Sequence, residues 1–370
     1  MGIGQRTYRI MISGGGTGGH IYPAISIAQA LKALNSDVQI LFVGARGKME
    51  MKKVSEAGFE IEGLWISGLQ RRISIKNLIF PIKLMWSLMK SFQLIRSFKP
   101  DVVVGVGGYA SGPLLYMATL NNIPTLIQEQ NSYAGLTNKW LSKSVSTICV
   151  AYENMDKFFP KHKIVFTGNP VRKDIFRDPT QASKAYAFFK LNPDKKTLLV
   201  IGGSLGAKTV NESIFLGLEQ LWSADIQLIW QTGSFYYSQI MSEMKKPWNE
   251  RLRMYDFIKE MQYAYTIADA VVSRAGAMSI SELMLSAKPS ILIPSPNVVA
   301  DHQTLNAQNL ISRGAALMVS DAMARKMLLK TALSLLLDEK QQKGLSENIA
   351  AMGRPNAAID IAKKIIELAA

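Results

Sequence analysis

The chain has 370 residues and a formal net charge of +15, and 48% of its residues are hydrophobic. This length and composition are typical of a packed protein with room for two ordinary domains. The single cysteine, Cys149, excludes a disulfide framework and fits a reducing compartment. The one apolar run near the start, residues 10–12, is too short for the core of a signal peptide, so we expect a cytosolic protein.

Short apolar runs alternate with helical patterns along the chain, which predicts parallel sheets with helices on both faces. The first series of strands is expected at residues 8–13, 38–43, 102–106, 125–128, 147–150 and 163–166. The second series is expected at residues 197–201, 227–231, 253–257, 270–273, 290–293 and 316–319. The predicted fold class is α/β, with two Rossmann-like doubly wound domains that bind ligand in a cleft between them.

The domain boundaries are predicted from these two series of strands. We place the first domain at residues 1–167 and the second at 168–355. The tail reads as a terminal helix, 356–370, which we expect to pack on the first domain. The Met- and Leu-rich stretch 323–337 reads as a core helix.

The first strand runs into a glycine-rich turn, residues 14–19, which is followed by His20 and an expected helix from about Tyr22. Bare backbone amides at a helix N-terminus suit a pyrophosphate or another anion. An imidazole beside that anion can exchange a proton near neutral pH. The turn therefore predicts an anion site with acid–base chemistry.

The same glycines also satisfy the G-x-G-x-x-G spacing of a dinucleotide fold. That fold needs an acidic residue about 20 residues further on to hold a ribose. The second strand instead runs into Gly44, Ala45 and Arg46. NAD is therefore disfavoured, and Arg46 leaves an NADP-dependent reductase as a minor alternative.

Two more glycine turns follow predicted strands, at residues 107–113 and 202–207. Further on, Arg274 precedes an expected helix that carries Glu282, two helical turns later. A carboxylate on such a helix can bind both hydroxyls of a ribose, while the helix N-terminus faces the phosphates. The alternative for Glu282 is an ordinary acid on a helix surface.

The segment 63–100 is basic and apolar, without any Asp or Glu. A lysine interrupts its apolar run at 76, 83 and 90, so it does not span a bilayer, which takes about 20 apolar residues. It is either a buried helix with solvated lysines or a basic amphipathic surface for an anionic membrane, and we favour the membrane surface. No nucleic-acid partner is expected, because the segment offers no aromatic platform or recognition helix.

The residues expected to contact the membrane are Ile75, Lys76, Leu78, Ile79, Phe80 and Lys83. Pro81 breaks the pattern, which indicates a loop or short helix over 75–81 ahead of a longer helix that ends before Lys99.

Seven motifs cover essentially the whole chain: residues 14–20, 107–113, 127–131, 168–172, 202–207, 274–282 and 301–307. In this order they resemble the motifs of glycosyltransferase family 28, of the GT-B class, and in particular its peptidoglycan-synthesising members. The resemblance implies inverting transfer of N-acetylglucosamine from UDP-GlcNAc to the muramyl 4-hydroxyl of lipid I, which yields lipid II and UDP. A related glycolipid or natural-product glycosyltransferase, or a non-catalytic nucleotide-binding module, stays open as an alternative.

The resemblance also implies roles for individual residues. Donor contacts are expected from Thr17, Gly18, Gly19, Asn131, Arg172, Ser204, Ile258, Arg274, Ala277, Met278, Glu282, Gln303 and Asn306. Acceptor contacts are expected from Gly15, Gly16, His20, Gly108, Tyr109, Ser111 and Asn131. The chain departs from the family pattern at Gln128, Leu205 and Ala275, where many relatives have histidine, glutamine and serine.

Inverting transfer needs a base for the acceptor proton. We expect His20 to be that base, because a helix N-terminus favours neutral imidazole, with Glu129 as the competing candidate. The alternative for His20 is a hydrogen bond to the substrate alone. No Asp-x-Asp motif occurs, so no protein-bound metal or other cofactor is expected.

A lipid-linked acceptor implies a peripheral protein on the cytoplasmic face of the inner membrane. The expected partners are UDP-GlcNAc, lipid I, an anionic membrane surface and other proteins of cell-wall synthesis.

Overall fold

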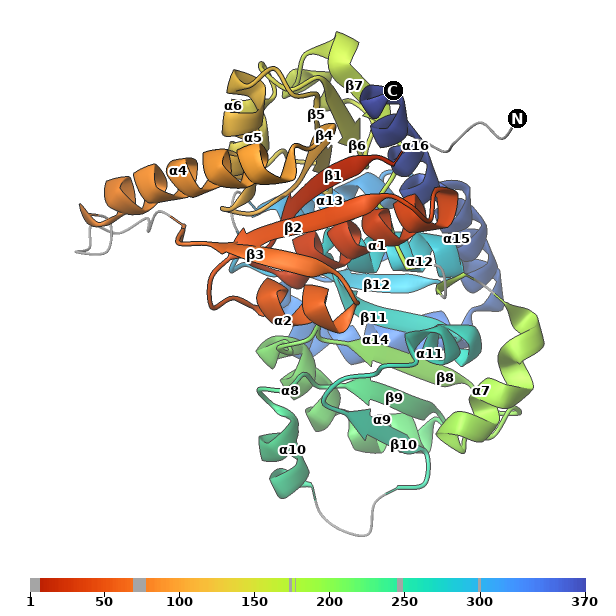
Figure 1. Ribbon diagram of the computed structural model, residues 1–370. Coiled ribbons are helices and arrows are strands. Elements are labelled where there is room, and N and C mark those ends of the chain that lie inside the picture. The colour runs from red at the N-terminus through yellow and green to blue at the C-terminus, as the bar shows by residue number, and fades with distance from the viewer. Residues whose placement is uncertain (1–6, 69–77, 173–174, 177, 245–248, 299–300) are drawn as a thin grey trace. The chain divides into compact units, whose positions relative to one another are not determined.

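The chain forms two compact units (Figure 1). The first comprises Met1–Arg172 with Pro355–Ala370, and the second comprises Lys173–Arg354. The boundaries expected from the sequence are 1–167 with 356–370, and 168–355. The computed structural model describes residues 7–68, 78–172, 175–176, 178–244, 249–298 and 301–370.

The sheet of the first unit has seven parallel strands in the order β3-β2-β1-β4-β5-β6-β7. Their bounds are β1 (Arg9–Gly14), β2 (Gln39–Ala45), β3 (Glu60–Leu64), β4 (Val102–Gly107), β5 (Thr125–Glu129), β6 (Thr147–Val150) and β7 (Ile164–Phe166). The predicted parallel sheet is thus confirmed. The sequence analysis missed β3, an edge strand that pairs with β2, because its glutamates obscure the apolar pattern.

Helices cover both faces of this sheet (Figure 1). Successive side chains of a strand point to opposite faces. Ile10 and Ile12 accordingly pack with α1 (Gly18–Leu34) and α16 (Ala357–Ala369), whereas Met11 faces α4 (Phe80–Phe98) and α5 (Ser111–Leu120). The C-terminal helix α16 contacts α1 and buries Ile361 and Ile365. The other α-helices in the described residues of this unit are α2 (Met49–Glu56) and α6 (Leu136–Leu141).

The sheet of the second unit has six parallel strands in the order β10-β9-β8-β11-β12-β13. Their bounds are β8 (Thr197–Ile201), β9 (Gln227–Gln231), β10 (Leu252–Tyr255), β11 (Ala270–Arg274), β12 (Ser290–Ile293) and β13 (Leu317–Met318). The helices are α7 (Ala182–Phe189), α8 (Lys208–Leu216), α9 (Leu218–Ser223), α10 (Tyr237–Glu243), α11 (Met261–Ile267), α12 (Ala277–Ser286), α13 (His302–Ile311), α14 (Ala324–Leu337) and α15 (Glu339–Ala351). Both units therefore have the doubly wound architecture predicted from the sequence.

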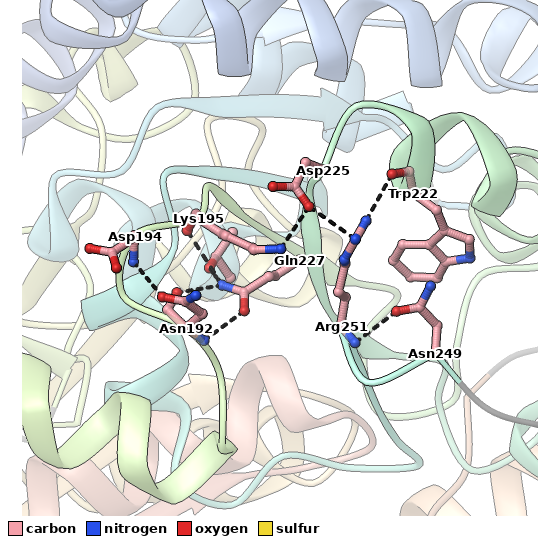
Figure 2. A network of polar contacts seen from close by, with 9 residues as sticks. Asn192, Asp194, Lys195, Trp222, Asp225, Gln227, Asn249 and Arg251 are labelled. Carbon is pink, nitrogen blue, oxygen red and sulfur yellow. Dashed lines mark hydrogen bonds and ion pairs between the residues drawn. The ribbon is translucent and has the colours of Figure 1, made fainter.

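A polar network closes the edge of the second sheet where β9 and its neighbours begin (Figure 2). Gln227, the first residue of β9, accepts a hydrogen bond from N of Asn192 at 2.7 Å and donates to its carbonyl at 2.8 Å. Asp225 forms ion pairs with Lys195 and Arg251, at 2.8 and 3.1 Å. These contacts tie together the loops that precede β8, β9 and β10. The network is structural, and the glycine loops lie at the opposite, carboxyl edge.

The strand order reverses at one point in each sheet, between β1 and β4 in the first unit and between β8 and β11 in the second. Doubly wound sheets bind ligands at the carboxyl ends of the strands beside this point. The glycine turns after β1, β4 and β8 follow these strands, so the topology selects them as candidate sites.

Candidate active site

The two glycine loops of the first unit touch each other through their backbones. N of Gly15 donates a hydrogen bond to the carbonyl of Gly107 at 3.2 Å. A Cβ on Gly108, whose φ is +93°, would lie 2.4 Å from the carbonyl oxygen of Gly15. Only glycine permits this approach. The contact brings the turn after β1 and the turn after β4 together at the point where the strand order reverses.

The start of α1 presents its backbone to this junction. Thr17 is extended at the N-cap position and exposed, and Gly18 and Gly19 open the helix. The first amides of a helix have no carbonyl partner within it, so they favour an anion. The predicted role of these three residues thus has a suitable local geometry, with Gly16 exposed beside them.

His20 is half-buried in the first turn of α1, with its ring over Gly107. Its Nδ1 lies 3.1 Å from the carbonyl oxygen of Gly15 and 3.3 Å from Oγ1 of Thr17. A carbonyl oxygen can only accept a hydrogen bond, so this contact places a proton on Nδ1. In the neutral ring the lone pair is then on Nε2, which is the nitrogen able to act as a base.

Glu50, which was not predicted from the sequence, is a buried carboxylate beneath the same loop. It is 0% exposed, and its two oxygens accept hydrogen bonds from N of Ala45 and N of Gly16, both at 3.1 Å. The dinucleotide-fold pattern expects an acid directly after the second strand, whereas Glu50 comes from the following helix, α2. No signal in the sequence near Glu50 indicates this contact, because Gly16 lies 34 positions away along the chain.

Glu129, the other candidate base, is buried at the end of β5. Its carboxylate accepts hydrogen bonds from N of Asn131 at 3.1 Å, N of Gly135 at 2.9 Å and Nδ2 of Asn138 at 2.9 Å. Four lone-pair positions are available on a carboxylate, and most are therefore used within the loop. This geometry suits a residue that shapes the loop and orients Asn131, and it favours His20 as the base.

Gln128 lies at the centre of a buried amide network. Its Nε2 donates to Oδ1 of Asn169 at 3.0 Å, and its Oε1 accepts from Nε2 of Gln130. Gln130 also donates to the carbonyl of Val106 at 2.7 Å, which ties the end of β5 to that of β4. The position at which many relatives have histidine thus has a structural role in this chain.

The remaining predicted acceptor residues differ in exposure. Tyr109 is 55% exposed and packs against Gly68. Ser111 is fully buried, and its hydroxyl donates to the carbonyl of Gly108 at 2.8 Å. Tyr109 can therefore contact a ligand directly, whereas Ser111 can act only by holding the loop.

In the second unit, the loop after β8 packs on the loop after β9. A Cβ on Gly233 would lie 2.0 Å from N of Gly206, and both residues have positive φ. The carbonyl of Ser204 accepts a hydrogen bond from N of Ser234 at 3.1 Å, which leaves the Ser204 side chain exposed. The loop thus offers a hydroxyl and backbone groups at the carboxyl end of β8.

The helix α12 begins directly after β11 with Gly276 at its N-cap. Gly276 has no side chain that could cap this end, and the amides of Ala277 and Met278 belong to the first turn, which has no carbonyl partners within the helix. Further along the helix, Oε2 of Glu282 accepts a hydrogen bond from the hydroxyl of Tyr265 at 3.0 Å. This fixes one oxygen of the carboxylate that is predicted to bind the ribose.

Ile258 is buried, and its N–H donates to Oε1 of Gln231 at 2.9 Å. The carbonyl of Ile258 is therefore the backbone group that could form a hydrogen bond with a nucleobase. Gln303 accepts a hydrogen bond from N of Ser295 at 2.9 Å, and buried Asn306 donates to the carbonyl of Ala275 at 3.3 Å. These two amides hold the loop after β12 and the turn after β11.

Arg274 was predicted to contact the donor together with Glu282. In the structure its guanidinium pairs with Asp321 at 2.5 Å and donates to the carbonyls of Ile293 and Pro294, and the donor contact stays a prediction. Only 15% of its side chain is exposed. This geometry favours a role for Arg274 in fixing the ends of β11 and β12. Arg172, at the end of the first unit, is half-buried.

Arg46, which the NADP alternative requires, is also engaged. Its guanidinium lies 4.5 Å from the ring centre of Trp86, and its Nε donates to the carbonyl of Gly63 at 3.0 Å. Across the part of the chain that the structure describes, no three His, Cys, Asp or Glu side chains gather in a way that could hold a metal ion.

The helix α4 exposes an apolar face, which we call the α4 stripe. It consists of Ile82, Met85, Met89 and Phe92, at helical spacing on α4, together with Leu78 and Ile79 directly before the helix. Of these residues, only Leu78 and Ile79 were predicted from the sequence, together with Phe80, which is half-buried.

The two lysines of α4 contact neighbouring side chains. Lys83 donates a hydrogen bond to Oγ of Ser67, and Lys90 forms an ion pair with Glu62, so these lysines anchor the helix. Ile75 and Lys76 lie outside the described residues. Pro81 stands in the first turn of α4, which it can start without loss of a hydrogen bond.

Comparison with known proteins identifies the family. The model of the glycosyltransferase family 28 N-terminal domain matches residues 10–150, and that of the C-terminal domain matches residues 197–365. A protein of Cytophaga hutchinsonii named UDP-N-acetylglucosamine–N-acetylmuramyl-(pentapeptide) pyrophosphoryl-undecaprenol N-acetylglucosamine transferase is 55% identical over 98% of both chains. A protein of the same name from Parabacteroides distasonis is 52% identical over 98% of this chain and 99% of its own.

The fold agrees with this relationship. A crystal structure of Acinetobacter baumannii MurG matches with a TM-score of 0.77 at 26% identity, over 98% of this chain and all of that one. The GT-B class expected from the motifs is therefore confirmed, and a dinucleotide-dependent reductase is excluded. The chain is a glycosyltransferase and belongs to glycosyltransferase family 28.

Proposed function

We propose that this chain transfers N-acetylglucosamine from UDP-GlcNAc to the 4-hydroxyl of the muramyl sugar of lipid I, forming lipid II and UDP. The observation that carries the proposal is the 55% identity over 98% of the chain to a transferase named for this reaction. Both units contribute to this match, since one domain model of the family lies within the first unit and the other covers most of the second unit and part of the C-terminal segment 355–370.

The second unit would bind the donor. Glu282, held by Tyr265, would bind the ribose hydroxyls, and the carbonyl of Ile258 would meet the uracil. The start of α12 and the loop with Ser204 would bind the pyrophosphate, because unpaired helix amides stabilise negative charge. The same groups would stabilise the charge that develops on UDP as it leaves. Arg172, Gln303 and Asn306 are proposed as further donor contacts.

The first unit would bind the acceptor and supply the base. Nε2 of His20 would take the proton of the 4-hydroxyl while the oxygen attacks C1 of the N-acetylglucosamine. The bond from C1 to the phosphate oxygen breaks in the same displacement, so the configuration at C1 inverts. Tyr109, Asn131 and the loops with Gly15, Gly16 and Gly108 would hold the acceptor. We propose no protein-bound metal in this reaction.

The α4 stripe would bring the enzyme to its lipid-linked substrate. It presents apolar side chains for insertion, and Lys83 and Arg96 of α4 would be attracted to anionic headgroups. Of the helices in the described part of the chain, none is both long and apolar enough to cross a bilayer. We therefore propose a peripheral protein at the cytoplasmic face of the inner membrane, near other proteins of cell-wall synthesis.

The reaction can be tested by UDP release from UDP-GlcNAc with and without a short-chain lipid I. We expect release that depends on the acceptor, and a product that carries one added N-acetylglucosamine. Release with an unrelated glycolipid or an aglycone, and none with lipid I, would instead assign the chain to another GT-B activity. The variant His162→Ala, at an exposed histidine in the first unit, controls for general effects of substitution.

A further inference from the structure

A buried carboxylate lies one peptide group away from His20. Oε2 of Glu50 accepts a hydrogen bond from N of Gly16 at 3.1 Å. The carbonyl of the same peptide group, which belongs to Gly15, lies 3.1 Å from Nδ1 of His20. The amide between Gly15 and Gly16 therefore has the carboxylate on its N–H side and the imidazole on its C=O side.

We propose that Glu50 is a positioning residue that acts on His20 through the Gly15–Gly16 peptide. The proposal deepens the proposed function and rests on it, because it takes His20 as the base. The carboxylate fixes the plane of the peptide and polarises it, since hydrogen bonds in a chain strengthen one another. The more negative carbonyl then keeps the proton on Nδ1 and stabilises the imidazolium that forms when Nε2 accepts a proton. A carboxylate bound directly to histidine has this role in hydrolase triads.

The surroundings of Glu50 are built to hold its side chain in this place. A Cβ on Gly15 would lie 2.3 Å from Oε1 of Glu50, and a Cβ on Gly44 would lie 2.7 Å from its Cγ. Its Oε1 accepts the N–H of Ala45, and the N–H of Gly15 is held by Gly107. The peptide between Gly15 and Gly16 is thus fixed from both sides. A purely structural role for Glu50 predicts lost stability alone, whereas a positioning role predicts a change at the imidazole.

The state of the imidazole can be read by ¹⁵N NMR of histidine-labelled protein without any substrate. The chain contains three histidines, so the variant His20→Ala assigns the ring signals of His20. In the wild-type protein, at a pH where the ring is neutral, we expect a proton on Nδ1 and a bare Nε2. A proton on Nε2 in the wild-type protein would overturn the proposal without the use of any further variant.

Glu50→Gln keeps the shape of the side chain but offers an oxygen to only one of the two amides. We expect the Nε2–H form to appear in this variant, and turnover to fall about 10- to 100-fold because the base is misplaced. The KM for UDP-GlcNAc should stay unchanged. Gly44→Ala, which displaces Glu50 without altering it, should have the same effects.

Asp101→Asn is the matched control. Oδ2 of Asp101 accepts a hydrogen bond from N of Arg9 at 2.7 Å at the amino edge of the same sheet. An asparagine still offers one oxygen to this amide, so the variant should change the melting temperature at most and leave the imidazole and turnover unaltered. A folded Glu50→Gln protein with the wild-type tautomer and turnover would overturn the proposal. Full turnover in His20→Ala would instead remove the base assignment, and the tautomer of the wild-type ring would still decide the link to Glu50.

Discussion

The glycine loop after β1 in the first unit and the loop after β8 in the second occupy equivalent places in two sheets that share the order of six strands, to which the first sheet adds β7. The first loop contacts the backbone of Gly107 and Gly108 and is also supported by a side chain, because the carboxylate of Glu50 binds its backbone at Gly16. The second loop rests on backbone, because Gly206 lies against Gly233 with no room for a Cβ. One scaffold thus supports its two loops in different ways.

This difference fits a division of labour. A loop that holds a histidine in one tautomer is suited to move a proton, and the first unit has such a loop. The second unit adds a bare helix start at α12 and the Tyr265–Glu282 contact, both of which are suited to bind a nucleotide. The strand order therefore determines where a ligand can bind, and the groups under each loop determine the chemistry there. Substitutions in one unit should separate catalysis from donor binding.

The largest effect is expected for His20→Ala in the first unit. Loss of a general base typically lowers turnover about 10²- to 10⁴-fold. The affinity for UDP should stay close to that of the wild-type protein, because Glu282 and α12 belong to the other unit. Steady-state kinetics and UDP calorimetry measure the two quantities, with His162→Ala as the control. A variant that keeps most of its turnover would transfer the base role to Glu129 or to water.

The next largest effect is expected for the α4 stripe, because membrane binding is predicted for the first unit and not for the second. Changing Leu78, Ile82 and Met85 to serine should reduce binding to anionic vesicles about 100-fold or more. Full burial of each such side chain is worth about 1.5–3 kcal/mol, so insertion of the three side chains to about half that extent contributes about 2–4.5 kcal/mol in total. Activity on a soluble, short-chain acceptor should be unchanged. Cosedimentation measures the binding.

The control for this variant uses exposed leucines of the second unit, with Leu216 and Leu337 changed to serine. Vesicle binding should be retained in this protein. If the stripe variant is folded and binds vesicles as well as the control does, the membrane contact lies elsewhere on the molecule.

In the second unit, Glu282→Ala should weaken UDP binding by about 1.5–3 kcal/mol, because charge-assisted hydrogen bonds to the ribose are lost. Tyr265→Phe removes the hydroxyl that orients this carboxylate, and we expect a smaller loss from it. Calorimetry with UDP measures both. An unchanged affinity in Glu282→Ala would remove the ribose assignment, and a loss of turnover at saturating donor would contradict the division between the units.

The sequence was informative where the signal is local. Glycine turns after apolar strands predicted both sheets and the loops at their carboxyl ends, because a strand, a turn and a helix follow one another within about 20 residues. The edge strand β3 was not predicted, since the glutamates at 60 and 62 interrupt its apolar residues. The α4 stripe was recognised only in part, because the side of a helix that faces solvent depends on what the other side packs against.

The site was less predictable, because its contacts join distant segments. Glu50 reaches the first glycine loop from α2, and nothing in its neighbourhood along the chain indicates a partner at Gly16. The pairing of Arg274 with Asp321 is likewise made across 47 positions. Sequence motifs identified residue types suited to the chemistry, whereas tautomer, burial and hydrogen-bond partners required the fold.

The smallest effect is expected for the free energy of unfolding at alkaline pH, where the buried groups that titrate differ between the two units. In the first unit, burial raises the pKa of the Cys149 thiol from 9.0 to about 12, and burial raises that of the Tyr152 hydroxyl as well. In the second unit, burial raises the pKa of Tyr186 and Tyr255, which are only partly buried. Above pH 9 the unfolded chain loses its thiol proton while the folded chain keeps it, so unfolding releases a proton and stability falls as the pH rises towards 12.

Cys149→Ala removes this contribution. The free energy of unfolding of the wild-type protein should therefore fall more steeply with pH than that of the variant, by up to about 1.4 kcal/mol per pH unit. Urea unfolding followed by circular dichroism, at about pH 8 and about pH 10.5, measures the difference. The loss of a buried side chain lowers the stability of the variant at both pH values, so the slopes carry the information and the absolute values do not. Parallel slopes would mean that Cys149 ionises in the folded protein as easily as in the unfolded one, which its complete burial in β6 opposes.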